Sequence, residues 1–120
     1  MNDARVWEFE ESLWTGSAEH YRESIDTECV MVLPHPPYVL AAEDAIEAVT
    51  DTPRWTKVEL SHREVKRPQE GLIAVAYKVA AFRNDEKGYE AYCTSTYRWL
   101  EHEVWRVVQH QQTPPVAIKA

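Results

Sequence analysis

The sequence predicts a single α+β domain in which helices come first and an antiparallel sheet follows. Apolar residues recur at helical spacing over the first 25 residues, and apolar runs typical of strands fill the chain from residue 55 onward. Turn-forming segments separate those later runs. A length of 120 residues fits one domain, which we assign to residues 1–120, with a core over 3–114 and a tail over 115–120.

Two helices are expected at the N-terminus. In the segment 3–15, Val6, Phe9 and Leu13 follow the spacing i, i+3, i+7 and form one apolar face. The same period continues over 17–25. Since almost no chain separates the two segments, we expect them to pack as a helical hairpin.

A short strand, a rigid loop and a third helix are expected next. The apolar strand covers 29–33 and is stopped by Pro34. The loop 34–38 contains three prolines, each of which fixes φ and removes a backbone donor. An Ala-rich helix follows over 42–49. It has two acidic residues in its first turn, where negative charges interact favourably with the positive end of the helix dipole.

The second half of the chain predicts a four-stranded antiparallel meander. Consecutive hairpins join its strands, and the helices must cover one face of the resulting sheet. The expected strands are one that begins near Trp55, then 72–82, 89–100 and 104–113, with turns at 67–71, 84–88 and 101–103.

Charge and composition exclude several classes of partner. The chain has 13 Lys and Arg against 20 Asp and Glu, a net charge of −7. Such a surface repels phosphate, so neither nucleic acid nor an anionic membrane is an expected partner. No apolar run approaches the ~18 residues of a membrane span, and no apolar signal segment opens the chain. We expect a cytoplasmic protein with Cys29 and Cys93 reduced, a Cys29–Cys93 bridge being the alternative.

Several short motifs stand in a characteristic order along the chain. They are Trp14-x-Gly16, Val75-x-Tyr77, Tyr89-x-Ala91-x-Cys93-x-Ser95 and a final strand that opens at Trp105 and closes with His110-Gln111-Gln112-Thr113-Pro114. In this order they resemble the SnoaL-like, ketosteroid-isomerase-related branch of the nuclear-transport-factor-2-like superfamily, and the ending is similar to that of bacterial members of unassigned function. The resemblance implies a cystatin-like cone, in which a curved sheet wraps helices around a pocket. It also implies a homodimer formed through the outer sheet face.

The resemblance does not extend to the catalytic residues of ketosteroid isomerase. When the chain is aligned on Gly16, Pro34 and the final hairpin, the family's general base falls at Leu33. Its oxyanion tyrosine falls near Phe9 and its second oxyanion acid near Ser95. None of these side chains can do the required chemistry. Because acidic residues cluster at turns and helix starts, the sequence predicts no carboxylate in the middle of an inward strand face.

The last strand supplies the first candidate site residues. Strand alternation and the resemblance together place Val108, His110 and Gln112 on the pocket face, although a bulge near Trp105 would exchange the two faces. His110 is the first candidate for an acid or base, because its ordinary pKa lies near neutrality. A structural or dimer-face histidine is the alternative. Gln112 either orients a ligand or ties down the C-terminal tail.

Four further candidates come from the loop and the central strands. His35 lies just after the missing base position and either replaces that base or faces solvent. Tyr38 either closes the pocket mouth or covers the edge of the core. A buried Tyr77 hydroxyl needs a partner, which is either a ligand or a neighbouring His or Gln. Ser95 shares the inner strand face with Cys93 by resemblance, and both are equally explained as small core residues.

Three functions remain open. The five Trp, six Tyr and two Phe favour a small-molecule-binding domain with an apolar, aromatic pocket. A cofactor-free lyase or isomerase would use His110 or His35 as acid or base and Tyr77 or Tyr38 as donor. A structural dimerisation domain would have a filled cone. Since the five histidines lack metal-binding spacing and no Gly-rich phosphate loop occurs, we expect neither a metal nor a cofactor.

Overall fold

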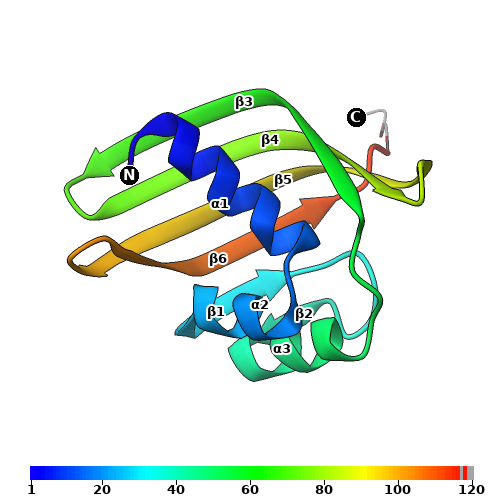
Figure 1. Cartoon of the computed structure of the whole chain (residues 1–120), viewed down its shortest axis with the longest axis horizontal. Helices are drawn as coiled ribbons and strands as arrows, with labels where there is room; N and C mark the ends of the chain where they lie inside the picture. Colours follow the sequence, from blue (N-terminus) through cyan, green and yellow to red (C-terminus); the bar gives the residue numbers. More distant parts are fainter. Residues whose placement is uncertain (117, 119–120) are drawn as a thin grey trace.

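A computed structural model describes residues 1–116 and 118, so the predicted tail 115–120 lies partly outside the described residues. Its helices and strands are shown in Figure 1. The helices are α1 (Asp3–Thr15), α2 (Ala18–Ser24) and α3 (Ala42–Thr50). The strands are β1 (Ile25–Val32), β2 (Val39–Ala41), β3 (Lys57–Gln69), β4 (Leu72–Arg83), β5 (Glu86–Glu101) and β6 (Val104–Thr113).

The two N-terminal helices form as predicted and follow each other directly. The Ser17 hydroxyl caps α2 by accepting a hydrogen bond from the backbone N–H of His20 at 3.1 Å. Gly16 lies between the helices, where a Cβ atom would come within 2.6 Å of the Ser12 carbonyl oxygen. Glycine therefore permits the close turn that brings α2 against α1.

The strands form one open, six-stranded sheet in the order β2-β1-β6-β5-β4-β3 (Figure 1). The expectation of a wholly antiparallel sheet is wrong at one place, because β1 pairs with β6 in parallel. Two strands joined by a short hairpin must be antiparallel. β1 and β6 are instead separated along the chain by the whole meander, so they can pair in parallel. The sequence pattern also missed β2, the short antiparallel partner of β1, and placed the start of β1 four residues late.

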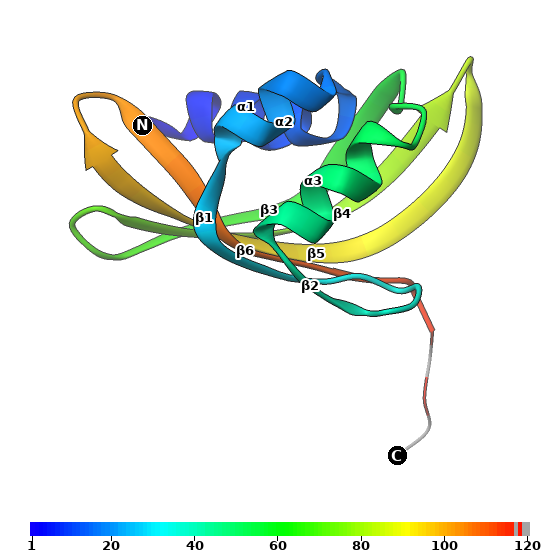
Figure 2. The ribbon, with the colours of Figure 1, turned by 90° about the horizontal axis from the view of Figure 1, so that it is seen from below.

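The predicted α+β architecture, with helices on one face of the sheet, is confirmed. Figure 2 shows the sheet bending around α1, α2 and α3, which all lie on its concave side. Register shifts in the β3–β4, β4–β5 and β5–β6 ladders introduce bulges, which bend strands and increase their twist. The result is a cone whose interior faces the helices. No helix among the described residues is both long and apolar enough to cross a membrane.

Candidate functional site

A cavity of about 280 Å³ opens inside the cone. It lies between the end of α1, the helices α2 and α3, the loop after β1 and the inner face of β4, β5 and β6. Most of its wall is aliphatic or aromatic. The polar residues that line it, besides two tyrosines, are His35, Thr52, Arg54, Arg83, His110 and Gln112.

A row of aromatic rings forms one side of this cavity. The Trp14 ring meets His110 edge-on, with centroids 6.0 Å apart, and lies 6.2 Å from the Tyr89 ring. Tyr89 in turn stacks on Trp55 at 6.3 Å, and the Arg83 guanidinium lies 3.9 Å from the Trp55 ring centroid. The row therefore runs from a cation at one end to an imidazole at the other, and its faces suit a planar apolar ligand.

The Tyr89 hydroxyl is the unsatisfied polar group of this wall. Its oxygen is buried and has no hydrogen-bond partner among the described residues. Burial, and to a lesser extent Cys93, raises the pKa of Tyr89 to about 12, so the hydroxyl keeps its proton at neutral pH. Leaving such a donor unpaired costs about 1–3 kcal/mol. A polar atom of a bound ligand would remove that cost.

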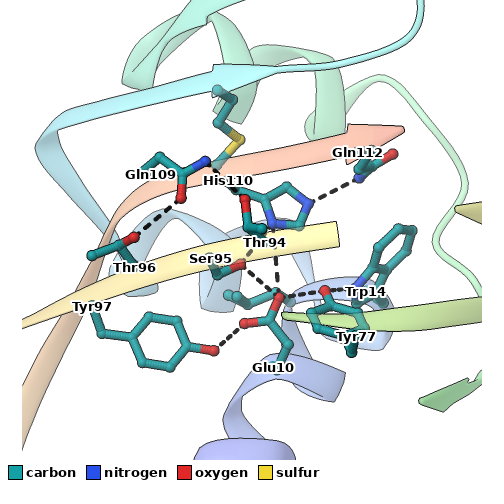
Figure 3. Close-up of polar contacts among 12 residues, drawn as sticks. Glu10, Trp14, Tyr77, Thr94, Ser95, Thr96, Tyr97, Gln109, His110 and Gln112 are labelled. Carbon is teal, nitrogen blue, oxygen red and sulfur yellow. Dashed lines mark hydrogen bonds and ion pairs between the residues drawn. The ribbon is translucent and has the colours of Figure 1, made fainter. Parts of the chain in front are cut away.

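Behind the aromatic row, α1 carries a fully buried carboxylate, that of Glu10. One of its oxygens accepts a hydrogen bond from the Tyr97 hydroxyl. The other accepts from the Tyr77 hydroxyl and, at 2.8 Å, from the Ser95 hydroxyl (Figure 3). Trp14 Nε1 donates to the Tyr77 oxygen at 3.0 Å. The sequence analysis looked for a carboxylate on the inward strand faces, whereas this one comes from the helix α1.

His110 joins this buried cluster to the cavity (Figure 3). Its Nδ1 lies 2.7 Å from the Ser95 hydroxyl oxygen and 3.7 Å from the nearer Glu10 oxygen. Ser95 has one proton, which it donates to the carboxylate, so Nδ1 must carry the hydrogen that bonds to Ser95. Nε2 then has the lone pair, which accepts a hydrogen bond from the Gln112 side-chain nitrogen at 3.1 Å. This arrangement fixes the tautomer and pairs Nε2 with Gln112, another residue of the cavity wall.

Burial sets the protonation of the surrounding groups. It lowers the pKa of His110 below its ordinary value, and the opposing effects of Glu10 and the Thr94 backbone are smaller. Burial, reinforced by Glu10, raises the pKa values of Tyr77 and Tyr97 well above their ordinary range. At neutral pH the imidazole is therefore uncharged and both phenols remain hydrogen-bond donors.

We expect this shift to make stability depend on pH. At a pH between the lowered pKa of His110 in the folded protein and its ordinary value of about 6.5, the unfolded chain binds a proton at His110 more readily than the folded protein does. The stability contributed by neutral His110 is complete above about pH 6.5 and decreases as the pH falls toward the folded-state pKa. Urea unfolding from pH 7 to pH 5 should show this decrease, and His110→Gln should flatten it. A slope as steep in His110→Gln as in the exposed-residue control His62→Gln would contradict this account.

Three of the seven predicted site residues line the cavity, namely His35, His110 and Gln112. Tyr77 and Ser95 are buried behind the wall, where they bind the carboxylate of α1. The partner of the Tyr77 hydroxyl is thus neither a ligand nor one of the histidines or glutamines considered from the sequence.

Tyr38 and Val108 are not among the lining residues. The Tyr38 side chain is 52% exposed. Val108 is an extra residue in β6, because Val107 and Gln109 pair with consecutive residues of β5. This bulge interrupts the expected alternation, so the inward position before it belongs to Val107 rather than Val108.

The sequence analysis missed five residues of this site. Glu10 could have been found, because it lies four residues after Val6 and three before Leu13, on the buried stripe of α1. The others lie in the segment after α3 or near the hairpin between β4 and β5, where no local pattern marks an inward side chain. They are Arg54, Trp55, Arg83 and Tyr89. Among the described residues, no cluster of three or more His, Cys, Asp or Glu is arranged to hold a metal ion.

Comparison with known proteins identifies the fold. No family model and no curated protein matches the sequence. Among solved structures, an NTF2-like protein of unknown function in nutrient uptake from Rhodospirillum rubrum superposes with a TM-score of 0.78, covering 97% of this chain and 100% of the other at 16% identity. The chain has the NTF2-like fold.

Two other structures support the same fold. An NTF2-like protein from Cytophaga hutchinsonii has a TM-score of 0.75 and 13% identity over 96% of this chain and all of its own. A provisionally named ketosteroid isomerase from Parabacteroides distasonis has a TM-score of 0.76 and 15% identity, covering 92% of this chain and 85% of its own. At such identities the NTF2-like fold is shared, and the chemistry must be argued from the cavity itself.

Proposed function

We propose that this chain binds a small, largely apolar organic molecule inside the cone. The observation that carries the proposal is the cavity of about 280 Å³, whose aromatic wall holds a buried Tyr89 hydroxyl with no partner among the described residues. Ligand cavities are typically apolar, with a few polar groups that fix orientation, and their volumes begin at about 300 Å³. The open cavity also argues against a filled cone with a purely structural role.

A titration with a neutral apolar probe tests this proposal. We expect 3-phenylpropionamide to shift the ¹H–¹⁵N NMR signals of residues around the cavity, such as Trp14, Ala48 and Tyr89, with one saturable binding curve. Signals on the outer sheet face, such as that of Tyr92, should stay unchanged. Shifts spread evenly over the surface, or no saturation at millimolar probe, would count against the cavity as a binding site.

A second candidate function is cofactor-free acid–base catalysis by a lyase or isomerase. The geometry that favours it is His110, which lines the cavity, with Nδ1–H held by Ser95 beside Glu10 and Nε2 in contact with Gln112. In this candidate, Nε2 exchanges its contact with Gln112 for the ligand and accepts a proton from it, and the Tyr89 hydroxyl donates a hydrogen bond to a developing oxyanion. Tyr77, considered from the sequence as that donor, already donates to the carboxylate. His35 lines the cavity as well and remains a candidate acid or base.

We also propose that a second copy of the chain covers the outer sheet face. Large apolar side chains are exposed there on β1 and β5, pointing away from the core residues next to them. They are Val30, Val32 and Tyr92. Large apolar side chains exposed on one sheet face are typical of interaction surfaces. Both cysteines are buried free thiols, which fits a reducing, cytoplasmic setting for this function.

A further inference from the structure

The charge of the cavity wall differs from that of the whole protein. The chain carries a net charge of −7, yet two arginines, Arg54 and Arg83, line the cavity and no Asp or Glu does. Eight other Lys and Arg residues pair with a carboxylate within 4.0 Å. Among the described residues, no carboxylate lies within that distance of Arg54 or Arg83. Arg54 is half-buried and Arg83 is exposed, so the two cations lie at the rim of the cavity, where their positive potential favours an anion.

Arg54 is held in place by backbone carbonyls. Its Nε donates to the Gly16 carbonyl at 2.8 Å and its Nη2 to the Leu13 carbonyl, at the end of α1. The guanidinium lies 5.5 Å from the Tyr21 ring centroid. These contacts leave Nη1 with no acceptor within the described part of the chain. Because the side chain is already ordered, binding an anion would cost little additional side-chain entropy.

Arg83 is held in a similar way at the end of the aromatic row. Its Nη2 donates to the Pro53 carbonyl at 3.0 Å, and its guanidinium stacks on Trp55. Tyr89, next to Trp55 in the row, adds a hydroxyl donor that has no partner among the described residues. The cavity therefore combines two guanidinium groups and one free O–H donor, which are the groups that recognise a carboxylate.

We propose that the ligand of this cavity is an organic carboxylate with an aromatic or short aliphatic body. Arg54, Arg83 and Tyr89 bind the carboxylate, and the body lies along the Trp14 side of the row toward His110. The inference rests on the proposed binding function and names its ligand class. It also gives the ligand one orientation, with the charged end away from the basic His110 nitrogen.

A matched pair of probes tests the charge preference. We expect 3-phenylpropionate to bind at least about tenfold more tightly than 3-phenylpropionamide in NMR titrations at pH 7 and constant ionic strength, since hydrogen bonds between charged groups are the stronger ones. Equal affinities would overturn the carboxylate assignment and leave the cavity as a neutral binding site. If neither probe binds, the proposed binding function fails together with this inference.

Variants locate the anion. Arg83→Gln should reduce the preference for the acid at least about fivefold while 3-phenylpropionamide binds as before, because a guanidinium adds a charge-assisted contact that only the carboxylate receives. Lys66→Gln makes the same change in net charge at an exposed position. Lys66 pairs with Ala74 of β4, whereas Arg83 follows Phe82 at the other end of that strand. This control should therefore leave the preference for the acid intact. Arg54→Gln also removes two hydrogen bonds to α1, so Arg83→Gln and Tyr89→Phe are the decisive variants. An undiminished preference in both would overturn the proposed anchor.

Discussion

Glu10→Ala is expected to lower the free energy of unfolding by about 3–5 kcal/mol. The substitution leaves the buried hydroxyls of Tyr77, Ser95 and Tyr97 without their acceptor, and each unsatisfied donor costs about 1–3 kcal/mol before any repacking or entry of water. Urea unfolding at pH 7 measures the loss. Glu10→Gln keeps the volume and one acceptor oxygen, so its loss should be smaller.

The control for this prediction lies on the same helix. Glu8 is exposed on α1, and Glu8→Ala should change the unfolding free energy by no more than about 0.5 kcal/mol. If Glu10→Ala and Glu8→Ala differ by less than about 1 kcal/mol, the buried carboxylate does not organise the interior of the cone.

Ala48→Phe is expected to weaken binding of 3-phenylpropionamide and 3-phenylpropionate at least about 100-fold. Ala48 lines the cavity from α3, so a phenyl ring at this position occupies the volume that the ligand body needs. A ligand excluded from an apolar site loses most of the burial that drives its binding. NMR titration measures the loss, and thermal unfolding checks that the variant is folded.

Ala4→Phe provides the matched control, because it adds the same side chain at an exposed position of α1. It should bind both probes as the wild type does. Retained binding in Ala48→Phe, with shifts at the same residues, would place the ligand outside the cavity.

The sequence was sufficient for the order of most elements, because their patterns are local. The stripe of Val6, Phe9 and Leu13 predicted α1, and the nearly continuous apolar run over 72–82 predicted β4. The parallel pairing of β1 with β6 could not be predicted, since it depends on how the meander closes against a distant strand. The bulge at Val108 was also invisible, because a bulge changes which residues face inward without a distinctive residue type.

The candidate site was only partly predictable for the same reason. Strand alternation together with the family resemblance predicted His110 and Gln112 on the pocket face, and both line the cavity. Arg54 and Arg83 enter the wall from segments outside any periodic pattern. Glu10 lay within a helix that was predicted correctly, but a charged residue on an apolar stripe was not recognised as a buried group.

A crystal structure grown with saturating 3-phenylpropionate tests the central claim most directly. The account predicts the phenyl ring against the aromatic row inside the cone, and a carboxylate oxygen within hydrogen-bond distance of the Tyr89 hydroxyl. A cavity that contains only ordered water, with the acid bound elsewhere on the molecule, would contradict it.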